Sequence, residues 1–357
     1  MSENLIVLAG KSAYRHIREK GLDPSDIDLV LGASGAAKWL AIYGLDSVLF
    51  SHWFRNRKTP LHLFGTSIGA WKFAAAARSE PEMGFASLKD AYIHQYYNGD
   101  VTPAKVSRES RRIMDLFLTE KTVDQALSHP FLRMGFSAVR CKHLMASESN
   151  LLQALGMLSA FDLNLLSRKL QRFCYERTLF HDPRYNPQVM ELNDYPTQRV
   201  ALDKNNFSKA LLASGSIPMV MKGVKDIPDA PRGVYRDGGL LDYHPAVPLG
   251  PDQKGFILYP HFYPEITPGW FDKKFPRRRV KGGLADRFIL LAPSPEFVAT
   301  LPFARIPDRR DFVRLKGQDE VRVKAWTRAA DMSYALGDEF MESVQTGSIR
   351  DRVRMIA

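Results

Sequence analysis

Ser67 lies where an apolar strand would turn directly into a helix of small residues. It is the third residue of GTSIG at positions 65–69, between LHLF at 61–64 and AWKFAAAA at 70–77. Gly65 and Gly69 would let the strand and the helix pass close together, so the pattern predicts a sharp turn that exposes the serine hydroxyl. The unpaired N–H groups and the positive dipole end at the start of the helix would stabilise a negatively charged tetrahedral adduct.

A serine hydroxyl is a weak nucleophile, so it needs a base within hydrogen-bond reach. The candidate base is Asp237, which follows the strand-like residues 233–236 and precedes Gly238 and Gly239. The two glycines allow a tight turn and a close approach of the backbone. An aspartate before glycines is also a common turn former, so a purely structural role stays open here.

The oxyanion of such an adduct also needs hydrogen-bond donors. The small residues SGAA at 34–37 follow a strand-like segment at 27–31 and would expose backbone N–H groups at a helix start, with the positive charge of Lys38 nearby. The alternative is a small-residue turn that only lets a helix pack on the sheet.

Four segments, in this order along the chain, resemble the motifs of the patatin-like lipid acyl hydrolases. Residues 34–38 resemble the glycine-rich loop G-G-G-A-[RK]-G of that family, and residues 65–69 its GxSxG motif. Residues 213–218 resemble its A-S-x-x-x-P turn, and residues 237–239 its DG[GA] motif. The span from residue 32 to 245 is about two thirds of the chain.

The resemblance implies a three-layer α/β/α sandwich with a mostly parallel central sheet, and a Ser–Asp dyad without histidine. Ser67 would be the nucleophile, and Asp237 would take its proton and later activate the deacylating water. The N–H groups of Gly35 and Ala36 would form the oxyanion hole. The family acts on phospholipids, lysophospholipids and other acyl esters, and neither a metal nor a cofactor is expected for acyl transfer.

Three residues depart from the family's glycine-rich loop. Ser34 and Ala36 stand where the family usually has glycine, and Trp39 stands at the final glycine position. An alanine keeps its N–H but accepts fewer backbone conformations, so we expect an oxyanion hole of different shape.

The element pattern independently predicts an α/β fold, because strand-like and helix-like segments alternate over the first 80 residues. We expect one domain over residues 1–357, with a helical insertion at 102–198 covering one face and a C-terminal extension at 251–357 completing or flanking the sheet. A single long helix is expected at about 319–344. Strands are expected at residues 5–9, 27–31, 61–64, 233–236, 255–259 and 287–291.

The composition of the 357 residues, with 45% hydrophobic and 25% charged, is that of a soluble globular protein. Cys141 and Cys174 lack the spacing of a zinc site or a disulfide framework. The chain shows neither a long apolar segment nor a basic leader, so we expect a cytoplasmic protein.

A formal net charge of +11 favours an anionic partner. Residues 270–281, WFDKKFPRRRVK, gather six basic and three aromatic side chains, a composition that suits the headgroup region of an anionic membrane surface. A solvated basic loop is the alternative for this basic–aromatic segment. Nucleic acid is disfavoured as a partner, because the basic residues fit none of the usual recognition modules.

Three other functions remain open at the level of sequence. An α/β-hydrolase would use a triad of Ser67, Asp237 and either His244 or His261, although too few strands come before the serine for that fold. A transacylase would pass the acyl group to an acceptor other than water. A non-catalytic protein could bind membrane surfaces through the basic–aromatic segment alone.

Overall fold

The computed structural model describes residues 4–97, 101–186 and 188–356, so both ends of the expected domain, residues 1–3 and 357, lie outside the described residues. Its centre is one mixed β-sheet. The strands are β1 Leu5–Ala9, β2 Ile27–Gly32, β3 Leu61–Gly65, β4 Leu132–Cys141, β5 Tyr175–His181, β6 Thr197–Ala201, β7 Val224–Lys225, β8 Val234–Asp237, β9 Phe256–Pro260, β10 Phe288–Pro293 and β11 Arg354–Met355.

The sheet is mostly parallel. Its strands run in the order β11-β1-β10-β9-β2-β3-β4-β5-β6, with β8 paired to β4 and β7 paired to β8. Among the described residues, six strand pairings are parallel and four are antiparallel. Residues 251–357 supply β9, β10 and β11, so the two ends of the chain meet in one sheet, where β11 pairs with β1.

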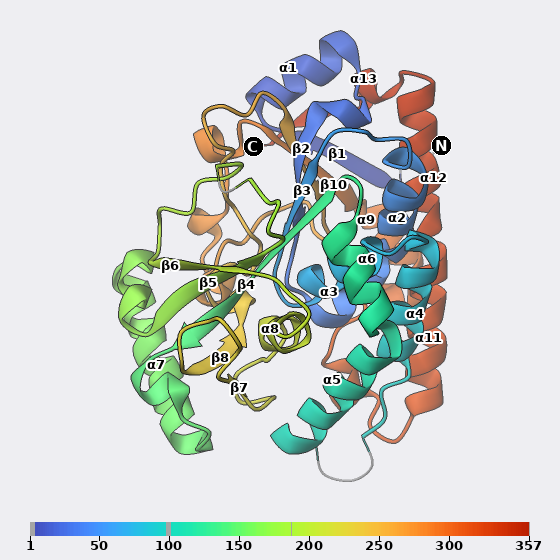
Figure 1. Ribbon diagram of the computed structural model, residues 1–357. Helices are drawn as coiled ribbons and strands as arrows, with labels where there is room; N and C mark the ends of the chain where they lie inside the picture. The colour runs from blue at the N-terminus through green and yellow to red at the C-terminus, as the bar shows by residue number, and fades with distance from the viewer. Residues whose placement is uncertain (1–3, 98–100, 187, 357) are drawn as a thin grey trace.

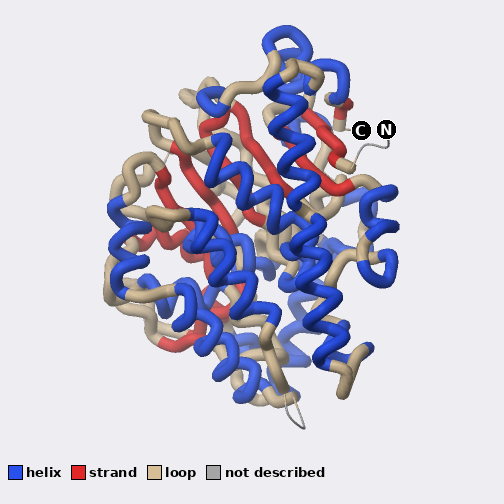
Figure 2. Tube along the Cα trace, turned by 90° about the vertical axis from the view of Figure 1, so that its right-hand side faces the viewer, coloured by secondary structure: helices blue, strands red, loops and turns tan. Residues whose placement is uncertain are grey.

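Helices and turns cover both faces of this sheet. The helices are α1 Lys11–Lys20, α2 Tyr43–Val48, α3 Ile68–Ala76, α4 Pro81–Ile93, α5 Pro103–Phe117, α6 Glu120–Ser128, α7 Asn150–Leu166, α8 Phe207–Ser214, α9 Pro295–Thr300, α10 Asp311–Arg314, α11 Asp319–Met332, α12 Tyr334–Gln345 and α13 Ile349–Arg352. In Figure 1, α2, α3, α4, α11 and α12 lie to the right of β2 and β3, and Figure 2 shows this helical layer in front of the strands.

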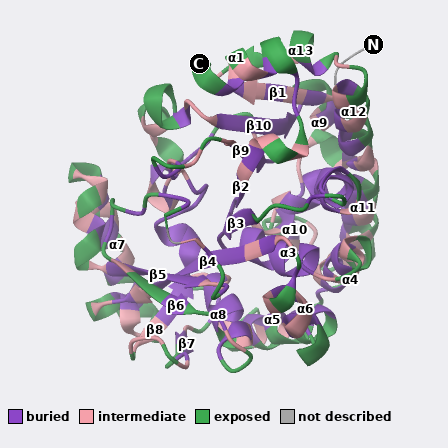
Figure 3. Ribbon diagram, turned by 45° about the horizontal axis from the view of Figure 1, so that its top comes forward, coloured by how far each residue is buried: buried purple, intermediate pink, exposed green. Residues whose placement is uncertain are grey.

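The opposite face is covered by α7 and by short 3₁₀ turns between residues 238 and 285 (Figure 1). Neighbouring residues of strand β4 pack against the two different layers. Ala138 lies in the main core, whereas Val139 packs with Ala160 of α7 and with Leu240. The expected three-layer α/β/α sandwich with a mostly parallel sheet is therefore confirmed. Figure 3 shows β2, β3 and β4 buried between outer helices whose far sides are exposed.

Close backbone packing explains the glycines around Ser67. Gly32 and Gly65 lie side by side at the ends of β2 and β3. A Cβ atom on Gly65 would lie 2.6 Å from the backbone of Gly69, and one on Gly69 would lie 2.2 Å from the carbonyl oxygen of Gly32. Only glycine fits at these positions, so α3 can start directly against the strand ends.

The prediction of a helical insertion at 102–198 is wrong. That segment includes α5, α6 and α7, but it also supplies β4, β5 and the start of β6. Charged residues in β5, such as Arg177, interrupt the run of apolar residues that is typical of a buried strand. In the structure the side chain of Arg177 in β5 is fully buried and pairs with Asp194 and Asp242, so long-range ion pairs satisfy its charge within the sheet.

The single long helix expected at about 319–344 is also interrupted, because α11 ends at Met332 and α12 starts at Tyr334. Ser333 lies between them, and its hydroxyl accepts a hydrogen bond from the N–H of Gly44 at 2.6 Å. Within the described ranges, none of the helices combines the length and the apolar character that crossing a bilayer requires.

Replacing Gly69 with alanine should destabilise the protein, because the new methyl group would meet the backbone of Gly32 rather than a movable side chain. Overpacking of this kind costs about 1–3 kcal/mol, which urea unfolding would measure. Gly283→Ala is the matched control, since a Cβ atom there meets nothing within 4 Å. Equal unfolding midpoints for the two variants would contradict the proposed close packing.

Candidate active site

Ser67 has the backbone conformation of a sharp strand-to-helix turn. Its φ of 54° and ψ of −127° lie in a region that non-glycine residues rarely occupy, at a cost of about 1–3 kcal/mol. The residue follows Thr66 and directly precedes α3, so the turn predicted from the GTSIG sequence is present.

The hydroxyl of Ser67 donates a hydrogen bond to Oδ2 of Asp237 at 2.7 Å. The other carboxylate oxygen, Oδ1, accepts a hydrogen bond from the N–H of Gly239 at 2.7 Å. Asp237 ends β8, where it lies opposite Ala138 of β4, and its side chain is buried. The structure therefore brings together the nucleophile and base candidates that the sequence indicated.

Burial raises the pKa of Asp237 from 3.8 to about 6. The hydrogen bonds from Ser67 and Gly239 and the positive charges of Lys273 and Arg309 oppose this effect but do not cancel it. A carboxylate whose pKa lies closer to neutral pH is a stronger base, yet it is still ionised at pH 7.

Residues 213–218, the A-S-x-x-x-P turn of the resemblance, hold both members of the dyad in place. The hydroxyl of Ser214 accepts a hydrogen bond from the N–H of Ser67 at 3.0 Å. The carbonyl of Ser216 accepts one from the N–H of Asp237 at 3.0 Å. Because the backbone N–H of Ser67 is occupied, the oxyanion donors have to come from elsewhere.

Ser34, which stands where the family usually has glycine, links the loop at residues 34–38 to the turn that carries Ser67. Thr66 donates a hydrogen bond from its hydroxyl to the carbonyl of Asp242 at 2.7 Å. The hydroxyls of Ser34 and Thr66 lie 2.8 Å apart, and the Thr66 proton is already used, so Ser34 is the donor. The N–H of Ser34 donates to the carbonyl of Tyr243 at 2.8 Å.

Gly35 and Ala36 line the same small chamber as Ser67 and Asp237. The N–H of Gly35 donates to none of the described residues, and Ala36 begins a 3₁₀ helix, so its N–H has no partner within that helix. Ala36 has a φ of 52°, a conformation that favours glycine, which explains why a glycine would suit this position. The oxyanion role of Gly35 and Ala36 stays a prediction, which their place in the chamber wall supports.

Ile68 supplies another N–H that the sequence analysis did not name. It is the first residue of α3 and lines the cavity beside Ser67. The first N–H groups of a helix have no partner within it, so this one adds to the positive end of the dipole next to the nucleophile. The helix start predicted after the GTSIG turn was the signal that could have identified it.

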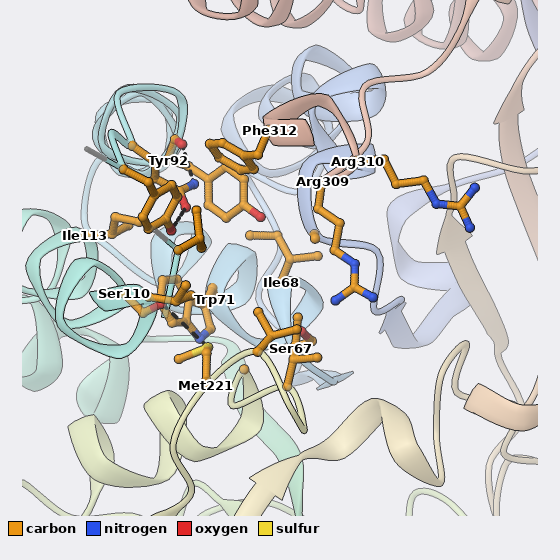
Figure 4. Close-up of a pocket in the computed structure, with 18 of the residues that line it drawn as sticks. Ser67, Ile68, Trp71, Tyr92, Ser110, Ile113, Met221, Arg309, Arg310 and Phe312 are labelled. Atoms are coloured by element: carbon orange, nitrogen blue, oxygen red, sulfur yellow. Dashed lines mark hydrogen bonds between the residues drawn. The ribbon is translucent and has the colours of Figure 1, made fainter. Parts of the chain in front are cut away.

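An apolar cavity of about 330 Å³ opens beside Ser67. Figure 4 shows Trp71, Ser110 and Met221 on one side of Ser67 and Arg309 on the other. Most of its other lining side chains are apolar or aromatic and come from α3, α4, α5 and α10, from Tyr97 and Val101 between α4 and α5, and from the loop at 215–221. They include Ile68, Tyr92, Tyr97, Val101, Val106, Ile113, Ile217, Val220, Phe312 and Val313.

A second, polar chamber of about 40 Å³ adjoins the dyad. Lys38 lies in its wall, as its predicted role in anion binding requires, and its amine pairs with Asp308 at 2.6 Å. Lys273 and Arg309 line the same chamber. Their position depends on the fold, and no local sequence motif distinguishes them.

The basic–aromatic segment, residues 270–281, turns partly toward this chamber instead of presenting one outer face. Trp270 and Lys273 line the chamber. Asp272 is fully buried and pairs with Arg278 at 2.8 Å and with Arg168. Because Lys273 and Arg277 are both exposed, the membrane contact predicted for this segment stays a prediction.

Lys273 is exposed on the solvent side of the chamber, but protein groups surround its amine. Loss of hydration, together with the nearby charges of Lys38 and Arg309, lowers the pKa of Lys273 to about 7. The water on its open side limits this effect.

His244 and His261 do not complete a triad. Nδ1 of His244 accepts a hydrogen bond from the N–H of Thr267, and its ring packs against His261 with centroids 4.2 Å apart. Burial lowers the pKa of His261 to about 3. No histidine in the described part of the chain hydrogen-bonds to Ser67 or Asp237, so the geometry favours a dyad.

Comparisons with known proteins give no relative for this chain: no family model, curated protein or solved structure matches it. The likeness to patatin-like hydrolases therefore rests on four sequence segments, which the fold brings together around Ser67.

Replacing Asp237 with asparagine should abolish catalysis and stabilise the fold. The amide can accept a hydrogen bond from Gly239 and donate one to Ser67, but it cannot take a proton at neutral pH.

The effect on stability follows from the pKa of Asp237, which is higher in the folded state than in the unfolded state. The stabilisation that the protonated carboxyl group provides is full below pH 3.8 and is lost as pH rises through 6. At pH 7.5 the ionised, buried carboxylate lowers the free energy of unfolding by about 2–3 kcal/mol. The variant should therefore melt at a higher temperature than the wild type, and this difference should shrink toward pH 4. A lower melting temperature at pH 7.5 would contradict this account.

The pH dependence of hydrolysis should report the ionisation of Asp237. On an uncharged, soluble ester, kcat/KM should rise with pH and level off above a midpoint near 6, because only the carboxylate accepts the serine proton. A profile that keeps rising through pH 8 would indicate a different base.

Proposed function

We propose that this protein is a serine acyl hydrolase that cleaves ester bonds of phospholipids or lysophospholipids through an acyl-enzyme intermediate on Ser67. The observation that carries the proposal is the 2.7 Å hydrogen bond from Ser67 Oγ to Asp237 Oδ2, at the junction of an apolar cavity and a polar chamber. A strained serine, a buried carboxylate and free N–H groups side by side are the parts that acyl transfer requires.

In the acylation step, Ser67 Oγ attacks the ester carbonyl carbon while its proton passes to Asp237. The carbonyl oxygen becomes an oxyanion, and the N–H groups of Gly35 and Ala36 are available to stabilise it. The C–O bond to the alcohol then breaks. Asp237 returns the proton to the departing oxygen, which leaves the acyl group on Ser67 and the carboxylate ionised.

In the deacylation step, a water molecule takes the place of the alcohol in the chamber. Asp237 removes its proton as the water oxygen attacks the acyl carbon, and the same oxyanion donors act again. The bond to Ser67 breaks, the serine recovers its proton from Asp237, and the fatty acid leaves. Each proton returns to its starting group, so the dyad is regenerated without a histidine.

The apolar cavity supports an acyl chain as the group that is transferred. Its volume of about 330 Å³ is at the small end of the range for ligand pockets, which is about 300–1,000 Å³. One chain suits that space better than two. Burying the chain there would place the ester carbonyl next to Ser67, which lines both the cavity and the chamber.

A panel of phospholipids, lysophospholipids and simple esters tests this proposal. Ser67→Ala should lower hydrolysis at least about a thousandfold, because no nucleophile replaces the hydroxyl. A fluorophosphonate probe should label the wild type but not this variant. Ser159→Ala, at a serine on the outer helix α7, is the matched control and should react like the wild type.

Two results would contradict the proposal: equal labelling of Ser67→Ala and wild type, or equal hydrolysis by both. Product analysis with a labelled lipid separates the alternatives. Free fatty acid indicates hydrolysis, whereas a new ester or amide indicates a transacylase.

A further inference from the structure

The polar chamber beside Ser67 contains two cations, Lys273 and Arg309, that act on the pKa of Asp237 from a distance and form no ion pair with it. Lys38 is neutralised by Asp308, with 2.6 Å between the amine and the carboxylate. The side chains of Lys273 and Arg309 form no ion pair with any residue in the described ranges, although both line the chamber. Two cations are therefore available to a ligand.

Aromatic rings, rather than carboxylates, hold these two cations. The Lys273 amine lies 3.8 Å from the ring centroids of both Tyr243 and Trp270. The Arg309 guanidinium lies 5.6 Å from the Trp270 ring. Cation–π contacts of this kind contribute about 0.5–1 kcal/mol at exposed sites and leave the charge uncompensated. With Lys38 neutralised by Asp308, these two cations outnumber the one carboxylate that the described residues place in the chamber wall, that of Asp237, so the chamber attracts an anion.

The two cavities define which part of a substrate would meet these cations. Ser67, Ala36, Ile217 and Arg309 line both cavities. Trp71 and its apolar neighbours line only the larger one, whereas Lys273 lies only in the chamber. An ester whose acyl chain fills the apolar cavity therefore directs its alcohol portion into the cationic chamber.

We propose that the substrate is a single-chain acyl ester whose alcohol portion carries a phosphate monoester, and that Lys273 and Arg309 determine this specificity by binding the phosphate. This inference rests on the proposed function. A phosphate monoester carries a charge of about −1.5 to −2 at pH 7. Its approach would favour the protonated form of Lys273, whose pKa is about 7, so that two cations face the bound phosphate. A trimethylammonium headgroup would meet like charges, and a neutral alcohol would leave the cations without a partner.

The test compares three soluble esters with the same short acyl chain, used below the concentration at which they form micelles. Their alcohol portions are glycerol, glycerol 3-phosphate and glycerophosphocholine. For the wild type, kcat/KM should be at least tenfold higher on the phosphate monoester than on either other ester. Monomeric substrates exclude an effect of membrane surface charge.

Lys273→Gln and Arg309→Gln should each lower the ratio of phosphate to neutral ester kcat/KM about tenfold, mainly through KM. Lys273→Arg should retain most of the preference, because it keeps the charge. Lys274→Gln is the matched control, since that lysine is the exposed neighbour and does not line the chamber. The ratio in this control should equal that of the wild type.

Each possible failure has its own meaning. Equal kcat/KM values for the three esters would overturn the inference but leave the hydrolase proposal intact. No hydrolysis of any ester, together with no probe labelling of Ser67, would overturn the proposed function. Binding of inorganic phosphate by calorimetry, without a preference for the phosphate ester, would show that the chamber takes free phosphate, and this would also overturn the inference.

Discussion

The candidate active site is built on the hydrogen bond between Ser67 and Asp237, which joins residues 170 positions apart in the chain. Two sheet pairings make it possible, because β3 and β8 pair with successive stretches of the same edge of β4, opposite β5. The same pairings bury the carboxylate and raise its pKa to about 6. The position of the Asp237 carboxylate and its raised pKa therefore have one cause, which is the burial of this side chain between packed elements.

A network of buried polar groups keeps this bond in place. Asp242, shortly after the dyad aspartate, accepts hydrogen bonds from Arg177 and Ser137 through its carboxylate, and from Thr66 through its carbonyl. Thr66 directly precedes the nucleophile. An ion pair between β5 and the turn after β8 thus supports the strained backbone of Ser67, and this explains why charged residues lie within the sheet.

The sequence predicted the parts of the site whose geometry is local. Gly65 and Gly69 indicated a close contact between strand and helix because only glycine permits it, and the structure shows that contact. The strands of residues 102–198 escaped prediction because buried partners far along the chain neutralise charges such as Arg177. The roles proposed for Lys273 and Arg309 could not be predicted from local sequence, since only the folded chain brings these residues to Ser67.

The most direct test of the central claim is mass spectrometry of the intact protein, quenched in acid shortly after mixing with a soluble short-chain ester. The account predicts one acyl group per molecule, located by peptide mapping on Ser67. An acyl group on another residue, or rapid hydrolysis with no acylated protein at any quench time, would contradict it.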